Sequence, residues 1–257
     1  MGCSLPTPSG AVSRASTSSQ GTRAVSYPCL VPLPPELHVV ADPSAAVGDL
    51  LADQASRGGS IVLTGGSTPG KAYEHAVART DDWSRVTLWW GDERCVPPDD
   101  ERSNYHLAQE TLLSRLAVPP RTVHRIRGEL DPKAAADELS QALKGARLDL
   151  LLLGLGPDGH TASLFPGSPQ LDVTDRPATH GPAGLEPWVE RVTFTLPTIH
   201  AAKRIVFLVA GSSKADAVAR AFGAEISPEV PASLTRLAPI PVEVFLDDAA
   251  TARMDRR

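Results

Sequence analysis

His160 is the residue of this sequence whose type and surroundings most favour chemistry. It lies in the stretch Gly-Pro-Asp-Gly-His-Thr-Ala-Ser-Leu-Phe-Pro, residues 156–166, directly after the longest apolar run of the chain, residues 148–155. An imidazole gains or loses a proton near neutral pH, so it can act as a base. A lone histidine in a loop is more often structural or merely exposed. Its place in a glycine-containing turn after an apolar run nevertheless predicts a general base at His160.

Ser163, in the same stretch, is the residue that a covalent mechanism would use. The spacing of His160 and Ser163 along one turn is no evidence of an activated pair. The sequence also lacks the strained Gly-x-Ser-x-Gly elbow that exposes the nucleophile of many serine hydrolases. We therefore expect water, rather than a serine, to be the nucleophile.

A glycine-rich stretch follows another apolar run, residues 61–64, and reads Gly-Gly-Ser-Thr-Pro. Glycines let a ligand approach the backbone closely, and the proline suits the first turn of the helix that we expect over residues 70–79. Free N–H groups, the helix dipole and two hydroxyls would together cradle a phosphate group. A tight strand-to-helix turn without a ligand would show the same pattern. The candidate phosphate-binding residues here are Gly65, Gly66, Ser67 and Thr68.

Charged side chains follow two further apolar runs. Asp92 and Arg94 come directly after residues 86–90, and Lys214 ends the stretch Gly-Ser-Ser-Lys after residues 205–210. Such charges are usually solvated or paired with one another. A lysine in the first turn of a helix opposes the helix dipole, however, and this placement is destabilising unless an anion lies nearby.

These candidate residues share a position, since each follows a short apolar run of strand type. The runs alternate with alanine-rich stretches of helical type, which predicts an α/β fold with a mainly parallel, doubly wound sheet and helices on both faces. In such open sheets, ligands bind beyond the carboxyl ends of the strands. The predicted strands are Leu37–Ala41, Ile61–Thr64, Val86–Trp90, Leu148–Leu155, Ile205–Ala210 and Val242–Leu246.

The first 35 residues differ in composition from the rest of the chain. Ser, Thr and Pro abound there, Arg14 and Arg23 are the only charged residues, and no acidic residue precedes Glu36. We expect a disordered extension over residues 1–35 and a single α/β catalytic domain over residues 36–257. An organellar targeting peptide has a similar composition, but the prolines disfavour its amphipathic helix. We therefore expect a cytoplasmic protein, with targeting as the alternative.

Composition excludes several classes of function. A net charge of -5 and a pI near 5.8 disfavour a nucleic-acid surface, which needs concentrated Lys and Arg. The longest apolar run contains Asp149 and is far too short to cross a membrane. Of the three cysteines, Cys3, Cys29 and Cys95, one stays unpaired whatever the others do, which indicates a reducing compartment. None of them shows the spacing of metal ligands, so we expect no metal site. The choice between a monomer and a homo-oligomer stays open.

Four stretches, in this order along the chain, resemble the glucosamine-6-phosphate isomerase and 6-phosphogluconolactonase family. They read Leu-Thr-Gly-Gly-Ser-Thr-Pro, Trp-Gly-Asp-Glu-Arg-Cys-Val, Gly-Leu-Gly-Pro-Asp-Gly-His-Thr-Ala-Ser-Leu-Phe-Pro and Val-Ala-Gly-Ser-Ser-Lys-Ala. The similarity runs from about Leu37 to Asp248. It implies hydrolysis of 6-phosphoglucono-1,5-lactone to 6-phosphogluconate, in the oxidative pentose phosphate pathway, without a metal or organic cofactor.

The resemblance also implies roles for single residues. His160 would deprotonate the water that attacks the lactone carbonyl, with Asp158 as the second catalytic residue. Arg94 would help to place the substrate, and Asp92 would hold Arg94 or contact the sugar. The resemblance assigns the phosphate to Lys214, Arg191 and the loop of residues 65–68.

Two alternatives share this resemblance. Amino-sugar-phosphate deaminases of the family carry a Glu five residues after the histidine, whereas this chain has Phe165 there. Sugar-phosphate sensors use a related sheet without turnover, but they also need a DNA-binding helix-turn-helix segment. Residues 1–35 lack the periodic apolar pattern of such a segment. A further departure is His200, where similar enzymes often carry Asn, and it puts only local polar contacts in doubt.

Overall fold

A seven-stranded parallel sheet forms the centre of the molecule in the computed structural model, which describes residues 31–254. The strand order is β1-β10-β9-β6-β2-β3-β5, and every neighbouring pair is parallel. Because both faces of the sheet are covered, its strands consist mainly of apolar residues. They are β1 (Glu36–Val39), β2 (Gly59–Leu63), β3 (Val86–Trp90), β5 (Thr122–His124), β6 (Leu150–Leu153), β9 (Ile205–Val209) and β10 (Val242–Leu246).

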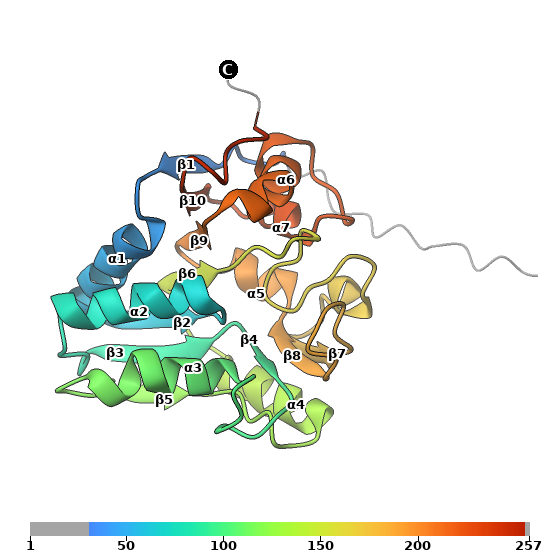
Figure 1. The fold of residues 1–257 in the computed structure, drawn as a ribbon. Coiled ribbons are helices and arrows are strands. Elements are labelled where there is room, and N and C mark those ends of the chain that lie inside the picture. The colour runs from blue at the N-terminus through green and yellow to red at the C-terminus, as the bar shows by residue number, and fades with distance from the viewer. Residues whose placement is uncertain (1–30, 255–257) are drawn as a thin grey trace, which may run out of the picture.

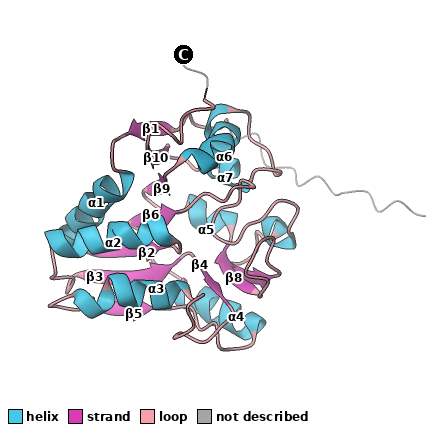
Figure 2. Ribbon diagram, viewed as in Figure 1, coloured by secondary structure: helices cyan, strands magenta, loops and turns pink. Residues whose placement is uncertain are grey.

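Helices cover both faces of this sheet (Figures 1 and 2). The first three helices lie in connections that carry the chain towards the β5 edge of the sheet. The later helices lie in connections that carry it towards the β1 edge. Because parallel crossovers are right-handed, the two directions place the helices on opposite faces. The helices are α1 (Pro43–Arg57), α2 (Ser67–Arg79), α3 (Asn104–Thr111), α4 (Pro132–Ala142), α5 (Leu196–His200), α6 (Ala215–Val218) and α7 (Pro231–Leu234). The predicted doubly wound α/β fold is therefore confirmed.

A second, smaller sheet was not expected from the sequence. It is antiparallel, with the strand order β4-β8-β7, and it lies beside the carboxyl ends of the central strands (Figure 1). Its strands are short and mostly polar, so they carry no apolar run of strand type. They are β4 (Asp92–Arg94), β7 (Ala178–Gly181) and β8 (Arg191–Phe194).

The predicted element ends differ from the observed ones by a few residues. The run 148–155 forms a strand only over Leu150–Leu153, and the turn that follows begins earlier than expected. Helix α3 begins at Asn104 because the Ser103 side chain caps it by accepting from the His106 N–H at 3.1 Å. The short edge strand β5 was not predicted.

Of the predicted N-terminal extension, residues 1–30 lie outside the described residues, and residues 31–35 contain no helix or strand. The described part of residues 36–257 carries both sheets and one continuous core of buried apolar side chains. Within residues 31–254, no helix is long and apolar enough to span a membrane.

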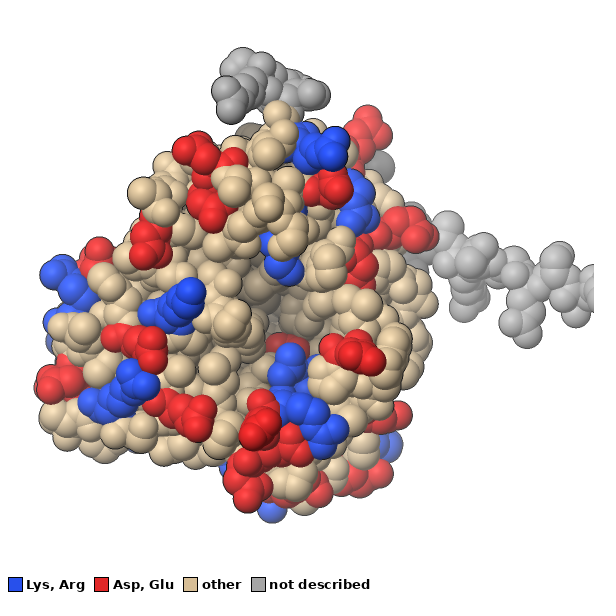
Figure 3. All heavy atoms as spheres, viewed as in Figure 1, with Lys and Arg blue, Asp and Glu red and all other residues tan. Residues whose placement is uncertain are grey.

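The chain changes direction between β2 and β6, which are neighbours in the central sheet. From β2 it continues to one side, through β3 to β5, and from β6 it continues to the other side, through β9 to β10. A crevice opens at such a switch point, outside the carboxyl ends of the two strands. Figure 3 shows a hollow in the viewed face of the molecule, with Lys and Arg side chains on both sides of it.

Candidate active site

A cavity of about 270 Å³ lies at this switch point. Its floor is formed by the residues that follow β2 and β6, and its sides include residues from the small sheet and from the segment after β9. Ser67, Thr68 and Asp158 do not line it. The predicted site residues that line it are Gly65, Gly66, Asp92, Arg94, His160, Arg191 and Lys214.

The turn after β6 fixes the imidazole of His160 against a carboxylate. Asp158 Oδ1 lies 2.6 Å from His160 Nδ1 and also accepts the backbone N–H of His160 at 3.1 Å. The chain can bring them this close because residue 156 is glycine: a Cβ there would lie 2.0 Å from His160 Nδ1. A second glycine, Gly159, takes the positive φ of +95° that the turn requires.

This pairing makes His160 Nε2 the free basic atom. A carboxylate at Nδ1 accepts the Nδ1 proton and so favours the tautomer with its lone pair on Nε2. Among the described residues, no hydrogen bond to Nε2 is present, and His160 lines the cavity. Burial raises the pKa of Asp158, but hydrogen bonds from His160 and its charge outweigh burial and leave that pKa below its usual value. Asp158 is therefore ionised near neutral pH.

Phe165 covers one side of the histidine. Its ring centroid lies 4.5 Å from that of His160, at an interplanar angle of 43°. The ring is buried and also lines the cavity. His160 therefore has a carboxylate at Nδ1 and an apolar ring beside it, and the second carboxylate expected in a deaminase is absent from residue 165.

The small sheet supplies the wall opposite Lys214, which we call the arginine wall: Asp92, Arg94 and Arg191. In the antiparallel pairing of β4 with β8, Arg94 lies directly opposite Arg191 and Asp92 lies opposite Thr193. Because side chains alternate along a strand, these residues share one face of the sheet, and that face lines the cavity. Glu93 points to the other face.

Both arginines of this wall keep unused donors. Arg191 is 3% exposed and donates from Nη2 to the Pro187 carbonyl at 2.8 Å, while Arg94 donates from Nη1 to the Arg102 carbonyl. Neither arginine forms an ion pair within residues 31–254, and both Nε atoms are buried without a partner there. Burial, together with the neighbouring charge of Arg94, lowers the pKa of Arg191 even though Asp92 opposes this. Two like charges with free donors form a site for an anion.

Asp92 does not hold Arg94. Its carboxylate is 5% exposed and accepts the Ser163 hydroxyl at 2.7 Å and the Asn104 amide at 3.3 Å. Of the two expected roles for Asp92, contact with the sugar is the one compatible with this geometry. The Ser163 hydroxyl therefore points to Asp92 rather than to His160, as expected for a serine that is not the nucleophile.

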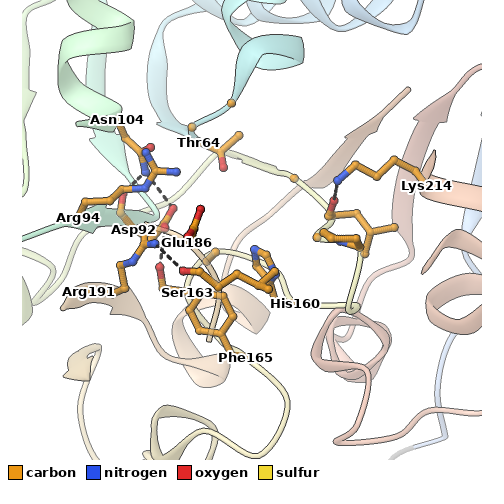
Figure 4. A pocket seen from close by; sticks show the side chains of 18 residues that line it. Thr64, Asp92, Arg94, Asn104, His160, Ser163, Phe165, Glu186, Arg191 and Lys214 are labelled. Atoms are coloured by element: carbon orange, nitrogen blue, oxygen red, sulfur yellow. Dashed lines mark hydrogen bonds between the residues drawn. The ribbon is translucent and has the colours of Figure 1, made fainter. Parts of the chain in front are cut away.

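Lys214 lies on the other side of the cavity. It ends the 3-10 turn η3 (Ser212–Lys214), directly before α6, and its Nζ donates to the Leu155 carbonyl at 2.7 Å. Burial lowers its pKa, although the charge of Asp158 opposes this. Figure 4 shows Lys214 and Arg191 on opposite sides, with His160 between them. The start of α2, capped by Gly66 without a side-chain hydrogen bond, lies at the rim.

Two polar residues that line the cavity, Asn104 and Glu186, were not predicted from the sequence as site residues. Asn104 begins α3, and its Nδ2 donates to the Asp92 carbonyl at 2.9 Å. Its contact with the loop after β2 also explains Gly65, where a Cβ would lie 1.9 Å from Asn104 Oδ1. Glu186 comes from the loop between β7 and β8, which carries no recognisable motif. Within residues 31–254, no group of three His, Cys, Asp or Glu side chains is placed to hold a metal ion.

Comparisons with known proteins point to one family for this chain. A family profile described as glucosamine-6-phosphate isomerases/6-phosphogluconolactonase matches residues 40–240. A 6-phosphogluconolactonase of Synechocystis sp. is 40% identical over 191 residues, which cover 68% of this chain and 76% of that protein. Probable 6-phosphogluconolactonase 1 of Arabidopsis thaliana is 36% identical over 218 residues, which cover 76% and 81%.

Solved structures show the same fold. The crystal structure of 6-phosphogluconolactonase from Leishmania guyanensis is 26% identical, with a TM-score of 0.76, over 86% of this chain and 98% of that chain. A monomeric glucosamine-6-phosphate deaminase is 20% identical, with a TM-score of 0.73, over 86% of this chain and 100% of that chain. The second likeness concerns the fold alone.

Proposed function

The chain belongs to the glucosamine-6-phosphate isomerase and 6-phosphogluconolactonase family, and on this premise we propose that it hydrolyses 6-phospho-D-glucono-1,5-lactone to 6-phospho-D-gluconate. This is the hydrolytic step of the oxidative pentose phosphate pathway. The observation that carries the proposal is the pairing of His160 with Asp158 in a cavity that has positive charge on both sides. The names of the most similar relatives support the same reaction.

His160 is the general base of the proposed mechanism. Its Nε2 takes a proton from water as the water oxygen attacks the lactone carbonyl carbon, and Asp158 stabilises the imidazolium that forms. The tetrahedral intermediate then expels the ring oxygen, which takes the proton back from His160. The ring ester bond breaks, a carboxylic acid and a hydroxyl form, and the imidazole is neutral again. The carboxylic acid then releases its proton to solvent, which leaves the carboxylate. General-base catalysis of this kind contributes roughly 10² to 10⁴ in rate.

The two sides of the cavity suit the two ends of this substrate. Lys214 and the start of α2 bind the phosphate, because a helix N-terminus and an ammonium group both attract a dianion. Arg94 and Arg191 face the lactone end, where negative charge develops on the carbonyl oxygen and remains on the product carboxylate. Since Figure 4 places Arg191 across the cavity from Lys214, we assign Arg191 to the lactone end rather than to the phosphate.

Phe165 favours this function over amino-sugar-phosphate deamination. Ring opening and proton shuttling by the deaminases need a second carboxylate near the histidine, besides the one that Asp158 supplies, and the ring of Phe165 occupies that place here. Hydrolysis of a lactone needs one base and a polar setting for the oxyanion, and the described side chains supply both.

The direct test is an activity assay on freshly generated lactone. Purified protein, with chelator present and no added metal, is expected to release acid from 6-phosphogluconolactone well above the spontaneous rate. Under the same conditions it is expected to release no appreciable ammonia from glucosamine 6-phosphate. Loss of lactonase activity on chelation would contradict the cofactor-independent reaction, and deamination as fast as hydrolysis would reverse the choice of function.

A further inference from the structure

Glu186 is a carboxylate of the cavity that the mechanism does not use. It is exposed, lines the cavity, and forms no hydrogen bond or ion pair within the described residues. Figure 4 shows its side chain on the side of the cavity that carries Arg191, which donates to the carbonyls on either side of Glu186. Of the carboxylates that line the cavity, Asp92 is buried and already accepts two hydrogen bonds, whereas Glu186 is free to accept a ligand.

The backbone on both sides of Glu186 is held by a residue of the site. Arg191 Nη2 donates to the Pro187 carbonyl at 2.8 Å and to the Leu185 carbonyl at 3.4 Å. Two residues earlier, Gly184 packs on the ring of Phe165 so closely that a Cβ would lie 2.6 Å from Phe165 Cγ. The loop that carries Glu186 is therefore anchored at Arg191 and Phe165, and both of these side chains line the cavity. A free polar group on a fixed backbone is the arrangement expected of a residue that orients a ligand.

The chemistry of a carboxylate narrows what Glu186 can bind. An ionised carboxylate only accepts hydrogen bonds. In a phosphorylated sugar lactone, the ionised phosphate and the lactone ester offer no donor, so the ring hydroxyls are the groups that can donate. From this we infer that Glu186 is a specificity-determining residue that accepts a hydrogen bond from a ring hydroxyl of the substrate. The inference rests on the proposed function.

The test compares substrates that lack single hydroxyls. The 2-, 3- and 4-deoxy forms of 6-phosphogluconolactone are assayed beside the parent lactone, with the unmodified protein, Glu186→Ala and Glu186→Gln. A hydrogen bond to a charged group contributes about 1.5–3 kcal/mol, so the unmodified protein should prefer the parent over one deoxy form by roughly 10- to 100-fold in kcat/KM. Glu186→Ala should remove that one preference, and Glu186→Gln, which keeps a neutral acceptor, should retain part of it.

Glu190→Ala is the matched control. Glu190 belongs to the same loop and carries the same charge, but it pairs with His180 at 3.4 Å and does not line the cavity. This variant should keep every substrate preference of the unmodified protein. The thermal melting temperatures of all variants show whether the loop and the fold are intact.

Two results would overturn the role of Glu186 and leave the lactonase function standing. One is equal kcat/KM of the unmodified protein on all four lactones, a measurement that needs no variant. The other is a Glu186→Ala variant that changes kcat/KM by the same factor on every lactone. Failure of the proposed function would look different, because the unmodified protein would then not hydrolyse the parent lactone at all.

Discussion

The two sides of the cavity are built in opposite ways. On the side of the histidine, each functional group already has a protein partner: His160 Nδ1 has Asp158, and Lys214 Nζ has the Leu155 carbonyl. On the arginine wall, the Nε atoms of Arg94 and Arg191 are buried without a partner among the described residues. A catalytic group needs an orientation fixed before the ligand arrives, whereas donors left free become satisfied only by the ligand. The difference indicates groups that are oriented before the ligand binds on one side, and donors left free for the negative charge of the reacting lactone on the other.

We expect the removal of a charge from the arginine wall to lower kcat/KM more than the removal of the Lys214 charge does. Arg191→Met should lower kcat/KM by roughly 10- to 100-fold, because hydrogen bonds to a developing anion are charge-assisted. The loss should be equal for 6-phosphogluconolactone and for unphosphorylated gluconolactone, since Arg191 faces the lactone end. Initial rates on both substrates measure it. A loss confined to the phosphorylated lactone would instead place Arg191 at the phosphate.

On the other side, Lys214→Ala is expected to act on the phosphate alone. We expect a KM about tenfold higher for the phosphorylated lactone, little change in kcat, and a weaker preference over unphosphorylated gluconolactone. The same two-substrate assay measures this effect, with Arg191→Met as its counterpart. An unchanged preference would remove Lys214 from the phosphate site and would break the comparison between the two sides.

The smallest expected effect is a pH dependence of ligand binding that comes from Lys214 alone. Burial lowers the pKa of Lys214 from 10.5, although the charge of Asp158 opposes this, so its charge is lost at a lower pH than that of an exposed lysine. The arginines stay charged throughout this range. Binding of 6-phosphogluconate, which survives alkaline conditions, should therefore begin to weaken below the pH at which an exposed lysine loses its charge. Calorimetric titration should show this weakening in the unmodified protein and not in Lys214→Ala.

The same contrast explains which parts of the site the sequence predicts. His160, Asp158 and Lys214 lie within a few residues of buried apolar strands, and local pattern locates both the strand and the turn after it. The same pattern locates Asp92 and Arg94, but their arrangement in the arginine wall depends on pairs that are distant in the chain, such as the Ser163 hydroxyl and Asp92, which are 71 residues apart. The strands that carry it are short and polar, so neither their existence nor the register of Arg94 with Arg191 follows from local pattern.

Two further residues show the limit of local reasoning. Asn104 looks like an ordinary helix start because Ser103 caps α3, and its contact with Asp92 becomes visible only when β4 and α3 are placed together. Glu186 lies in a loop without a motif, and the hydrogen bonds from Arg191 to the carbonyls beside it depend on how this irregular loop folds back towards β8. The unusual His200 makes a structural contact outside the site, since its Nε2 lies 2.9 Å from the Leu234 carbonyl and it does not line the cavity.

The central claim is that His160 provides the base, and the His160→Asn variant tests it most directly. Asn keeps a polar side chain but lacks a basic nitrogen, so the variant should fold, bind 6-phosphogluconate with nearly unchanged affinity, and lose roughly 10²-fold or more in kcat. The acidic limb of the pH–rate profile, which reports the protonation of His160, should disappear from the residual activity. A folded variant with full kcat and the original acidic limb would contradict the general-base assignment.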